Sequence, residues 1–438
     1  MTTKNSYRSA FLLVTVLFFL WGFITVLVDS LIPRLRELFT LTYFQAGLVQ
    51  FAFFGAYFVL SVPASYLLTK IGYKRGIILG LATMATGCLL FYPAASYRVF
   101  GVFMLAYFVL AGGMTILQVA ANPYVAVLGS EASASSRLNL SQAFNSLGTA
   151  IAPAVGALFL LSDKVLNSGS IEALTEAEKT TYYASEAAAV QMPFLGLAAF
   201  IGAIAVIFLL VQLPKLIENN HTGTYLEALK NKGLRLGVLG IFFYVGAEVA
   251  IGSYLVNYFL ELNVIEAIRN SDALMGIANT VATIFSKSLE GADDKALLGI
   301  FVICYWSGAM IGRFIGSGVM KYVQPAKVLV FFSGLAITSI VISMSSTGLV
   351  AMWSILAVGL FNSIMFPTIF TLSIDGIGDL KPKASGLLCT AIVGGAIIPP
   401  LYGLITDFVG FQVAYLLVIS CYTYILYFAS TKIKSRLS

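Results

Sequence analysis

The sequence predicts an all-α membrane protein, in which twelve transmembrane helices form two pseudo-symmetric six-helix bundles. Of its 438 residues, 59% are apolar and 11% are charged, whereas soluble domains average about 45–50% and about 25%. Apolar stretches of bilayer-spanning length recur twelve times, at about 20 residues per spanning helix, and particular motifs recur in both halves. This composition excludes a large soluble catalytic domain, a disordered regulatory tail and a nucleic-acid-binding module, so we expect no nucleic acid among the partners.

The apolar stretches divide the chain into two equal sets. They run over roughly 9–32, 44–69, 75–96, 99–128, 138–162, 191–213, 236–260, 296–320, 326–345, 347–374, 384–406 and 412–431. A polar stretch separates the sixth from the seventh. We therefore predict an N-terminal bundle over 1–213, a cytoplasmic linker over 214–235 and a C-terminal bundle over 236–438.

Basic residues set the expected orientation. With the twelve spans laid out, 18 of the 26 Lys and Arg residues, Arg313 among them, fall on the side of the two termini. Cytoplasmic loops carry the excess of positive charge, so both termini and the linker are expected in the cytoplasm. The first apolar run continues past the length of a signal peptide and has no cleavage site, which predicts a first span.

The two halves resemble one another at particular positions. Gln118 and Asn362 each stand five residues before a mid-helix proline, Pro123 and Pro367. The fifth and eleventh spans share the same separations, from Arg137 to Gly148 to Pro153 and from Lys383 to Gly394 to Pro399. Internal repeats of this kind are typical of secondary transporters.

Two acidic residues, Asp29 and Glu248, fall inside apolar spans. A charged side chain at the bilayer centre costs about 2.5–3.5 kcal/mol, so it normally faces a cavity or a partner and marks a transport path. Glu248 lies about 18 Å from the cytoplasmic edge at about 1.5 Å per residue. The structural alternatives are a permanently protonated Glu248 bonded to a neighbouring helix, and an Asp29 that marks the outer end of the first span.

Neutral polar and aromatic residues in the spans suggest what is carried. The carboxamides are Gln118, Asn122, Gln142, Asn145 and Asn362. Carboxamides both donate and accept hydrogen bonds, which suits sugar hydroxyls, although bonding between helices is the alternative for each. Trp21 and Phe366 are candidates to stack on the apolar face of a pyranose, whereas most of the other aromatic residues are expected to pack in the core.

Other chemistry is not encoded in recognisable form. There is no GxxxxGK[ST] motif for nucleotides, and the single histidine, His221, lies in the linker. The four cysteines stand in apolar runs without metal-ligand or disulfide spacing. We therefore expect neither an enzyme nor a cofactor or metal site.

Four segments carry a resemblance to a known family: LQVAANPYVAVLGS, SRLNLSQAFNSLGTAIAP, FYVGAEVAIGSYLVNY and GLFNSIMFPTIF. The chain resembles the glucose/galactose branch of the bacterial fucose:proton symporter family, within the major facilitator superfamily, over nearly its whole length. The resemblance implies the major facilitator fold and a monomeric carrier in the cytoplasmic (inner) membrane. It also implies import of a hexose with a coupling cation, a proton, by alternating access.

The resemblance also implies roles for particular residues. Asp29 matches the proton-exchanging carboxylate, Gln142 and Asn145 match sugar contacts, and Trp21 and Phe366 match cavity aromatics. In addition, LLTKIGYKRG resembles the superfamily's loop motif, in which Gly72, Lys74 and Arg75 would form a cytoplasmic clasp that gates the inward-open state, although the usual acid is missing.

The chain departs from the fucose pattern in the cavity. Gln118 stands in place of a glutamate, and Glu248 stands in place of a glutamine, so the second carboxylate has moved to the other half. Val26 and Val28 replace amides. These differences argue against fucose and leave the hexose open. A sodium-coupled hexose symporter, a proton-coupled exporter of another small solute and a non-transporting receptor remain alternatives.

Overall fold

The computed structural model describes residues 2–38, 43–160, 174–214, 223–284, 289 and 293–434. Within these ranges every regular element is a helix. In a bilayer each backbone group must be satisfied inside the protein, and a helix achieves this within a single segment.

The first half contains α1 (Thr2–Leu38), α2 (Tyr43–Tyr97), α3 (Phe100–Val127), η1 (Glu131–Ser133), α4 (Ala134–Leu160) and α6 (Glu176–Leu210). After α7 (Tyr225–Lys230), the second half contains α8 (Lys232–Glu261), α9 (Ile265–Arg269), α10 (Asp272–Ile284), α11 (Asp294–Val319), α12 (Pro325–Ser345), α13 (Gly348–Asn362), α14 (Met365–Ile374), η2 (Gly378–Leu380), α15 (Lys381–Thr390), η3 (Ala391–Val393), α16 (Gly394–Val409) and α17 (Phe411–Lys434).

These helices account for the twelve predicted crossings. The described residues contain ten helical segments that are long and apolar enough to span a membrane. One of them, Leu48–Tyr97, holds two crossings that meet at Gly72. There the backbone has φ 75°, a conformation that glycine adopts without strain. The amide- and serine-rich α4 is the twelfth crossing, so the predicted fold class is confirmed.

Local sequence explains where several helices begin. Asn231 caps α8 by accepting a hydrogen bond of 3.0 Å from the backbone N–H of Leu234. Asp293 caps α11 through the N–H of Ala296, at 2.8 Å. Short polar side chains at these positions satisfy donors that have no partner within the helix.

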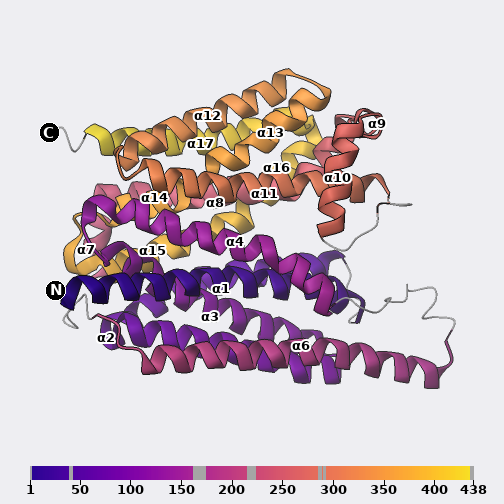
Figure 1. The fold of residues 1–438 in the computed structure, drawn as a ribbon, viewed down its shortest axis with the longest axis horizontal. Helices are drawn as coiled ribbons and strands as arrows, with labels where there is room; N and C mark the ends of the chain where they lie inside the picture. Colours follow the sequence, from indigo (N-terminus) through magenta and orange to yellow (C-terminus); the bar gives the residue numbers. More distant parts are fainter. Residues whose placement is uncertain are drawn as a thin grey trace.

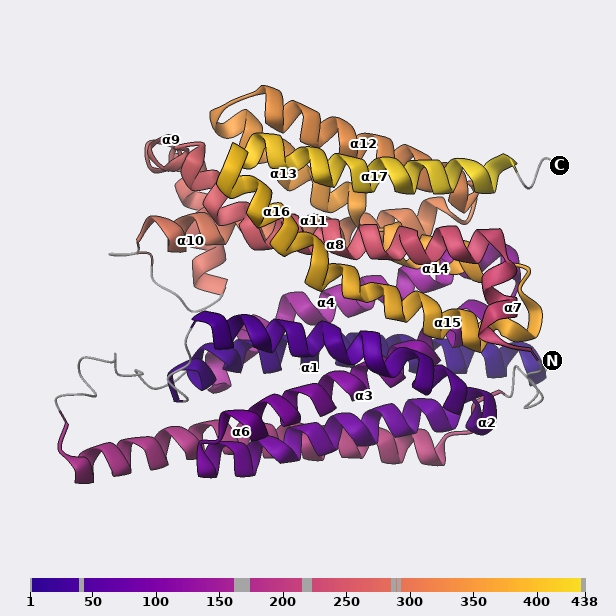
Figure 2. The ribbon, with the colours of Figure 1, turned by 180° about the vertical axis from the view of Figure 1, so that it is seen from behind.

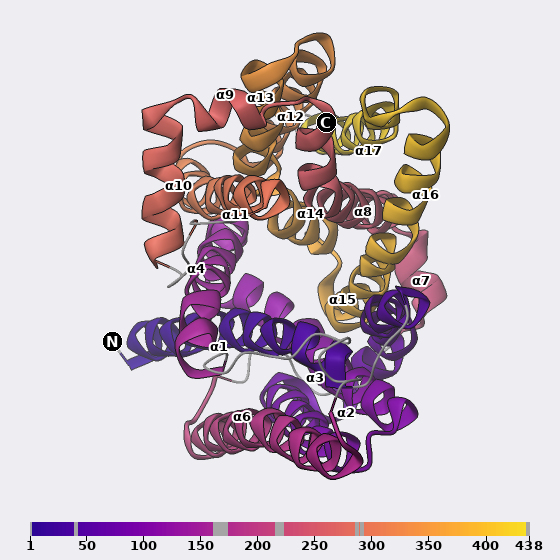
Figure 3. The same cartoon turned by 90° about the vertical axis from the view of Figure 1, so that its right-hand side faces the viewer.

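The helices gather in two groups with a gap between them (Figure 1). The first group contains α1, α2, α3 and α6, and the second contains α8, α12, α13 and α17, as the view from behind also shows (Figure 2). Two pairs of helices connect the groups: α4 lies against α11 on one side, and α15 lies against α2 on the other (Figure 3).

Both termini and α7 lie at one end of the molecule, whereas α9 and α10 lie at the other (Figures 1 and 2). The predicted linker falls at the end with the termini, and its residues 215–222, including His221, lie outside the described residues. Because α8 begins at Lys232, the seventh helix starts earlier than the predicted residue 236.

The internal repeat appears in the packing. A Cβ added to Gly148 on α4 would overlap the backbone carbonyl of Phe19 on α1. A Cβ added to Gly394 at the start of α16 would overlap the backbone carbonyl of Phe242 on α8. The two glycines, paired by the sequence repeat, therefore allow the same close backbone approach in each half.

Hydrogen bonds between α4 and the second half close the end that carries the termini. The hydroxyls of Ser135 and Thr371 are 2.6 Å apart. Ser136 Oγ donates to the carbonyl of Ser317 at 2.7 Å, and Ser317 Oγ donates to the carbonyl of Ser136 at 2.9 Å. The amide of Asn139 donates to Thr368 at 3.1 Å.

The α15 side of the same end is closed as well. Ser385 Oγ donates to the carbonyl of Val119 on α3 at 2.8 Å. At the surface, Lys381 pairs with Glu131 at 3.3 Å. The structure is therefore in a conformation sealed at the end that carries the termini.

Candidate functional site

A cavity of about 340 Å³ lies between the two groups of helices. Its size is within the about 300–1,000 Å³ that small-molecule sites occupy. Its lining combines aromatic, carboxamide and charged side chains from both halves: Trp21, Thr25, Phe53, Phe54, Tyr57, Gln118, Gln142, Asn145, Thr149, Tyr244, Glu248, Trp306, Arg313 and Phe366.

Glu248 contributes a carboxylate near the middle of α8, sixteen residues after its first residue and thirteen before its last. Its side chain is 14% exposed, and it lines the cavity. Tyr244, one helical turn earlier, donates its hydroxyl to Glu248 Oε1 at 2.6 Å. The structure thus brings Glu248 to the cavity, in the company of a charged residue that the sequence analysis placed elsewhere.

That residue is Arg313, and its predicted place at the cytoplasmic edge is wrong. Arg313 lies six residues inside the end of α11, and its Nη2 is 3.8 Å from Glu248 Oε1. Its Nε donates to the carbonyl of Ser363 at 3.0 Å, and its Nη1 donates to the hydroxyl of Ser146 on α4. A position near a helix end suggested an exposed base, but buried acceptors hold the guanidinium in the cavity.

Three of the predicted carboxamides line the cavity from the first half. Asn145 Nδ2 donates to the carbonyl of Phe18 at 2.9 Å, which fixes α4 against α1. Gln142 Nε2 lies 3.4 Å from the Oδ1 of Asn122. Among the described residues, the buried Gln118 Oε1 has no hydrogen-bond donor. An acceptor buried without a partner is costly, so Gln118 is suited to receive a donor from a ligand.

The structure places Asn362 away from the cavity, contrary to the prediction that it binds substrate. It is fully buried, and its Nδ2 donates to the hydroxyls of Tyr305 at 2.6 Å and Tyr422 at 3.1 Å. Asn362 thus joins α13 to α11 and α17. The alternative of helix-to-helix bonding describes this residue.

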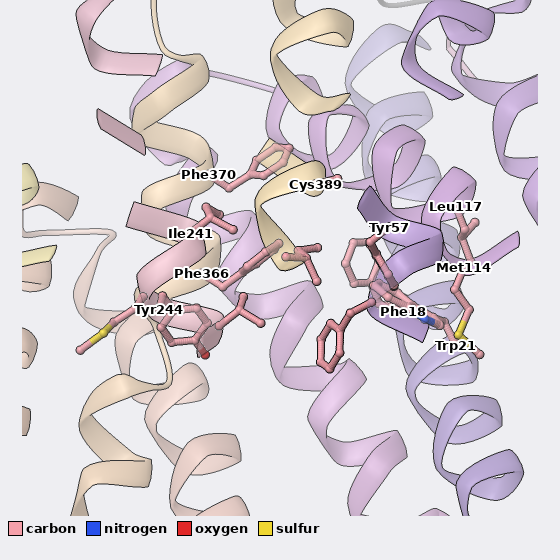
Figure 4. Packing of buried hydrophobic residues seen from close by; sticks show 14 of the residues in the cluster. Phe18, Trp21, Tyr57, Met114, Leu117, Ile241, Tyr244, Phe366, Phe370 and Cys389 are labelled. Carbon is pink, nitrogen blue, oxygen red and sulfur yellow. The ribbon is translucent and has the colours of Figure 1, made fainter. Parts of the chain in front are cut away.

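The predicted aromatic residues lie on opposite sides of the cavity. Figure 4 shows Trp21 near Phe18 and Tyr57 on one side, and Phe366 near Tyr244 and Phe370 on the other. Trp21 is 6% exposed and Phe366 is 8% exposed. The Phe366 ring lies 6.4 Å from that of Tyr244, centroid to centroid. Both predicted aromatics therefore line the cavity.

Several lining residues were missed by the sequence analysis, notably Thr25, Tyr57, Thr149, Tyr244 and Trp306. For Tyr244 a signal existed, because it precedes Glu248 by four residues and so shares its helix face. The other aromatics had no such signal, since the chain contains 22 Tyr, 33 Phe and 3 Trp, most of them outside the cavity.

Asp29 belongs to α1, but its side chain lies outside the described residues. The predicted clasp residues lie at the sealed end of the molecule. Lys74 Nζ donates to the carbonyl of Leu209 at the end of α6, at 2.9 Å, within the same half. Gly72 provides the bend between the second and third crossings, and Arg75 is exposed.

Twelve crossings in two groups, sealed at one end around an ionisable cavity, define a multi-pass membrane transport protein. The sequence matches the model of the Major Facilitator Superfamily over residues 10–392. The chain belongs to this family, whose members are transporters and not enzymes.

Individual relatives extend over the whole chain. It is 45% identical to the glucose/galactose transporter of Brucella abortus biovar 1 (strain 9-941), covering 99% of this chain and 96% of that protein. It is 34% identical to the L-fucose-proton symporter of Escherichia coli (strain K12), covering 97% and 93%. A crystal structure of the family member FucP in the outward conformation matches with a TM-score of 0.85 and 32% identity, covering 98% and 99%.

Proposed function

We propose that the protein imports a hexose of the glucose or galactose type in symport with a proton. The observation that carries the proposal is the position of Glu248, an ionisable group in a cavity that also presents Gln118, Gln142 and Asn145. The names of the relatives, which include a glucose/galactose transporter and an L-fucose-proton symporter, support the same substrate class and the same coupling ion.

Sugar recognition would come mainly from the first half. Gln118, Gln142 and Asn145 offer amide donors and acceptors, and Gln118 Oε1 awaits a donor. Trp21 and Phe366 provide flat apolar surfaces for the ring face of a pyranose. Glu248 would accept from a sugar hydroxyl on the opposite side.

Coupling would depend on the charge of two carboxylates, Asp29 and Glu248. An ionised carboxylate in a cavity closed to water is expensive, because the charge loses its hydration. The loaded carrier therefore closes readily once a proton neutralises the carboxylate and the sugar satisfies the amides. One charge that moves through about 100 mV supplies about 2.3 kcal/mol. At about 1.4 kcal/mol per tenfold, this sustains roughly a fortyfold sugar gradient.

Alternating access would proceed by rocking of the predicted bundles over 1–213 and 236–438. The sealed end is held by few hydrogen bonds, such as those between Ser136 and Ser317. Each contributes a net of about 0.5–1.5 kcal/mol, a cost that ligand binding can offset. We propose that this end faces the cytoplasm, that the protein resides in the cytoplasmic (inner) membrane, and that one chain suffices for transport. Gly72, Lys74 and Arg75 would then secure the bundle when that end opens.

The test is uptake of radiolabelled galactose and glucose into liposomes that contain the purified chain. We expect accumulation driven by an inward proton gradient and abolished by a protonophore. Uptake that instead follows sodium at fixed pH would establish the sodium-coupled alternative. Competition by apolar cations but not by hexoses would favour an exporter. Binding of sugar without any uptake would identify a receptor. A panel of unlabelled hexoses defines the preferred sugar.

A further inference from the structure

Arg313 places a permanent positive charge beside the carboxylate on which the proposed coupling depends. The side chains of Arg313 and Glu248 are each 14% exposed, and their nearest charged atoms are 3.8 Å apart. This separation allows strong attraction in a partly desolvated site but is longer than a hydrogen bond.

The guanidinium reaches three elements. Nη2 faces Glu248 on α8, Nη1 donates to Ser146 on α4, and Nε donates to the carbonyl of Ser363. Ser363 lies at the interruption between α13 and α14, four residues before Pro367. Because proline has no N–H, the carbonyl four residues earlier has no helical donor. The proline thus leaves an acceptor that anchors Arg313.

The other titratable neighbours of Glu248 are phenols. Tyr244 lies on α8, Tyr305 on α11 and Tyr422 on α17. Tyrosine is neutral at physiological pH. Within the described part of the chain, Arg313 is therefore the cation whose field acts on Glu248.

A symporter must also return to its starting conformation without sugar and proton. In that step Glu248 is ionised while the cavity closes around it, and an unpaired carboxylate would oppose closure. Protonation explains how the loaded carrier crosses but leaves the return of the empty carrier unexplained.

We propose that Arg313 is a positioning residue that pairs with ionised Glu248 and so allows the empty carrier to reorient. This inference rests on the proposed function. In the empty carrier the two charges cancel. In the loaded carrier, protonated Glu248 leaves Arg313 with a net positive charge, which the acceptors on Ser363 and Ser146 bind. A guanidinium is weakly hydrated and tolerates such sites, and a membrane potential that is negative inside favours its movement inward.

The experiment compares two transport modes of the full chain in liposomes. Counterflow exchange, with galactose on both sides, requires only the loaded carrier to shuttle. Net downhill uptake also requires the empty carrier to return. For Arg313→Gln we expect the ratio of net uptake to exchange to fall by about tenfold or more. Arg313→Lys retains the charge and should keep the ratio within about threefold of the wild type.

The double variant Glu248→Gln/Arg313→Gln has no charge to bury, so its ratio should return toward that of the wild type. A general packing defect predicts that net uptake and exchange fall together in Arg313→Gln and that the double variant is no better. Either result would overturn the inference. If Arg313→Gln does not fold, the ratio in the double variant still decides, because an unrestored ratio contradicts charge pairing. A wild-type chain that transports no sugar contradicts the proposed function instead.

Discussion

The Nε of Arg313 donates a hydrogen bond of 3.0 Å to the carbonyl of Ser363, the residue four positions before Pro367. The equivalent carbonyl in the first half, that of Val119, lies four positions before Pro123 and accepts from Ser385 at 2.8 Å. Each mid-helix proline therefore leaves a carbonyl for a side chain of another helix. In one half this interaction holds the cavity charge, and in the other it helps to seal the end that carries the termini.

Pro367→Ala should impair transport through Arg313. Alanine restores an N–H that competes for the Ser363 carbonyl, so the guanidinium loses an anchor. We expect net uptake to fall about two- to tenfold, since one hydrogen bond contributes a net of about 0.5–1.5 kcal/mol. Initial rates of galactose uptake measure the effect. Pro325→Ala is the control, because Pro325 is the first residue of α12, where its missing N–H has no helical partner. Equal effects of the two substitutions would contradict this explanation.

Glu248→Gln should abolish accumulation of sugar. Glutamine keeps the size of the side chain and can still accept from Tyr244, which donates at 2.6 Å, but it cannot carry a proton. Asp29→Asn should likewise abolish accumulation and retain counterflow exchange. Radiolabelled galactose uptake under an imposed proton gradient measures both variants. Normal accumulation by both would refute the assignment of the coupling site.

The sequence predicted the fold well because the signals of a membrane helix are local. Length and hydropathy alone marked eleven crossings, and repeat symmetry supported α4, whose serines and amides make it polar. Glu248 could be predicted because a carboxylate in the middle of an apolar run needs a reason. These inferences need no knowledge of which helices touch.

The sequence analysis was least accurate where the partner of a residue lies on another helix. Arg313 stands near the end of α11, as an interfacial base would, and its acceptors Ser146 and Ser363 are 167 and 50 residues away. Asn362 occupies the repeat position of the cavity residue Gln118, yet Tyr305 and Tyr422 bind it in the core. Such pairings depend on how the helices pack, which no single segment encodes.

Gln118 and Asn362 should therefore respond differently to the same substitution. Gln118→Leu removes a group that lines the cavity, so the half-saturating sugar concentration should rise about two- to tenfold with little change in stability. Asn362→Leu removes donors to two buried tyrosine hydroxyls, so the thermal stability in detergent should fall. The sugar affinity of the Asn362 variant that remains folded should be unchanged. The reverse pattern would return Asn362 to the binding site.

Removal of the reciprocal serine bonds should favour opening of the sealed end. In Ser136→Ala/Ser317→Ala two hydrogen bonds between the halves are lost, at 2.7 and 2.9 Å, worth about 1–3 kcal/mol together. The population of the opposite conformation should rise by about fivefold or more. A cysteine introduced at the buried Ala126 reports this as faster labelling by a water-soluble maleimide. Ser420→Ala is the control, since Ser420 bonds only within its own helix, to the carbonyl of Leu416. Unchanged labelling in the double variant would show that these bonds do not hold the end closed.

The repeated glycines offer a test of pseudo-symmetry in the packing. An added methyl group on Gly148 or Gly394 meets backbone atoms of the facing helix, which cannot move aside as a flexible side chain can. Each substitution by alanine should destabilise the protein by about 1–3 kcal/mol. Gly202→Ala in α6 has no neighbouring atom within 4 Å, so it should be neutral or stabilising, because alanine is the better helix former. Thermal unfolding in detergent compares the three variants. Because Gly148 and Gly394 serve the same approach in each half, similar losses are expected, and a loss confined to one of them would show that the halves pack by different rules.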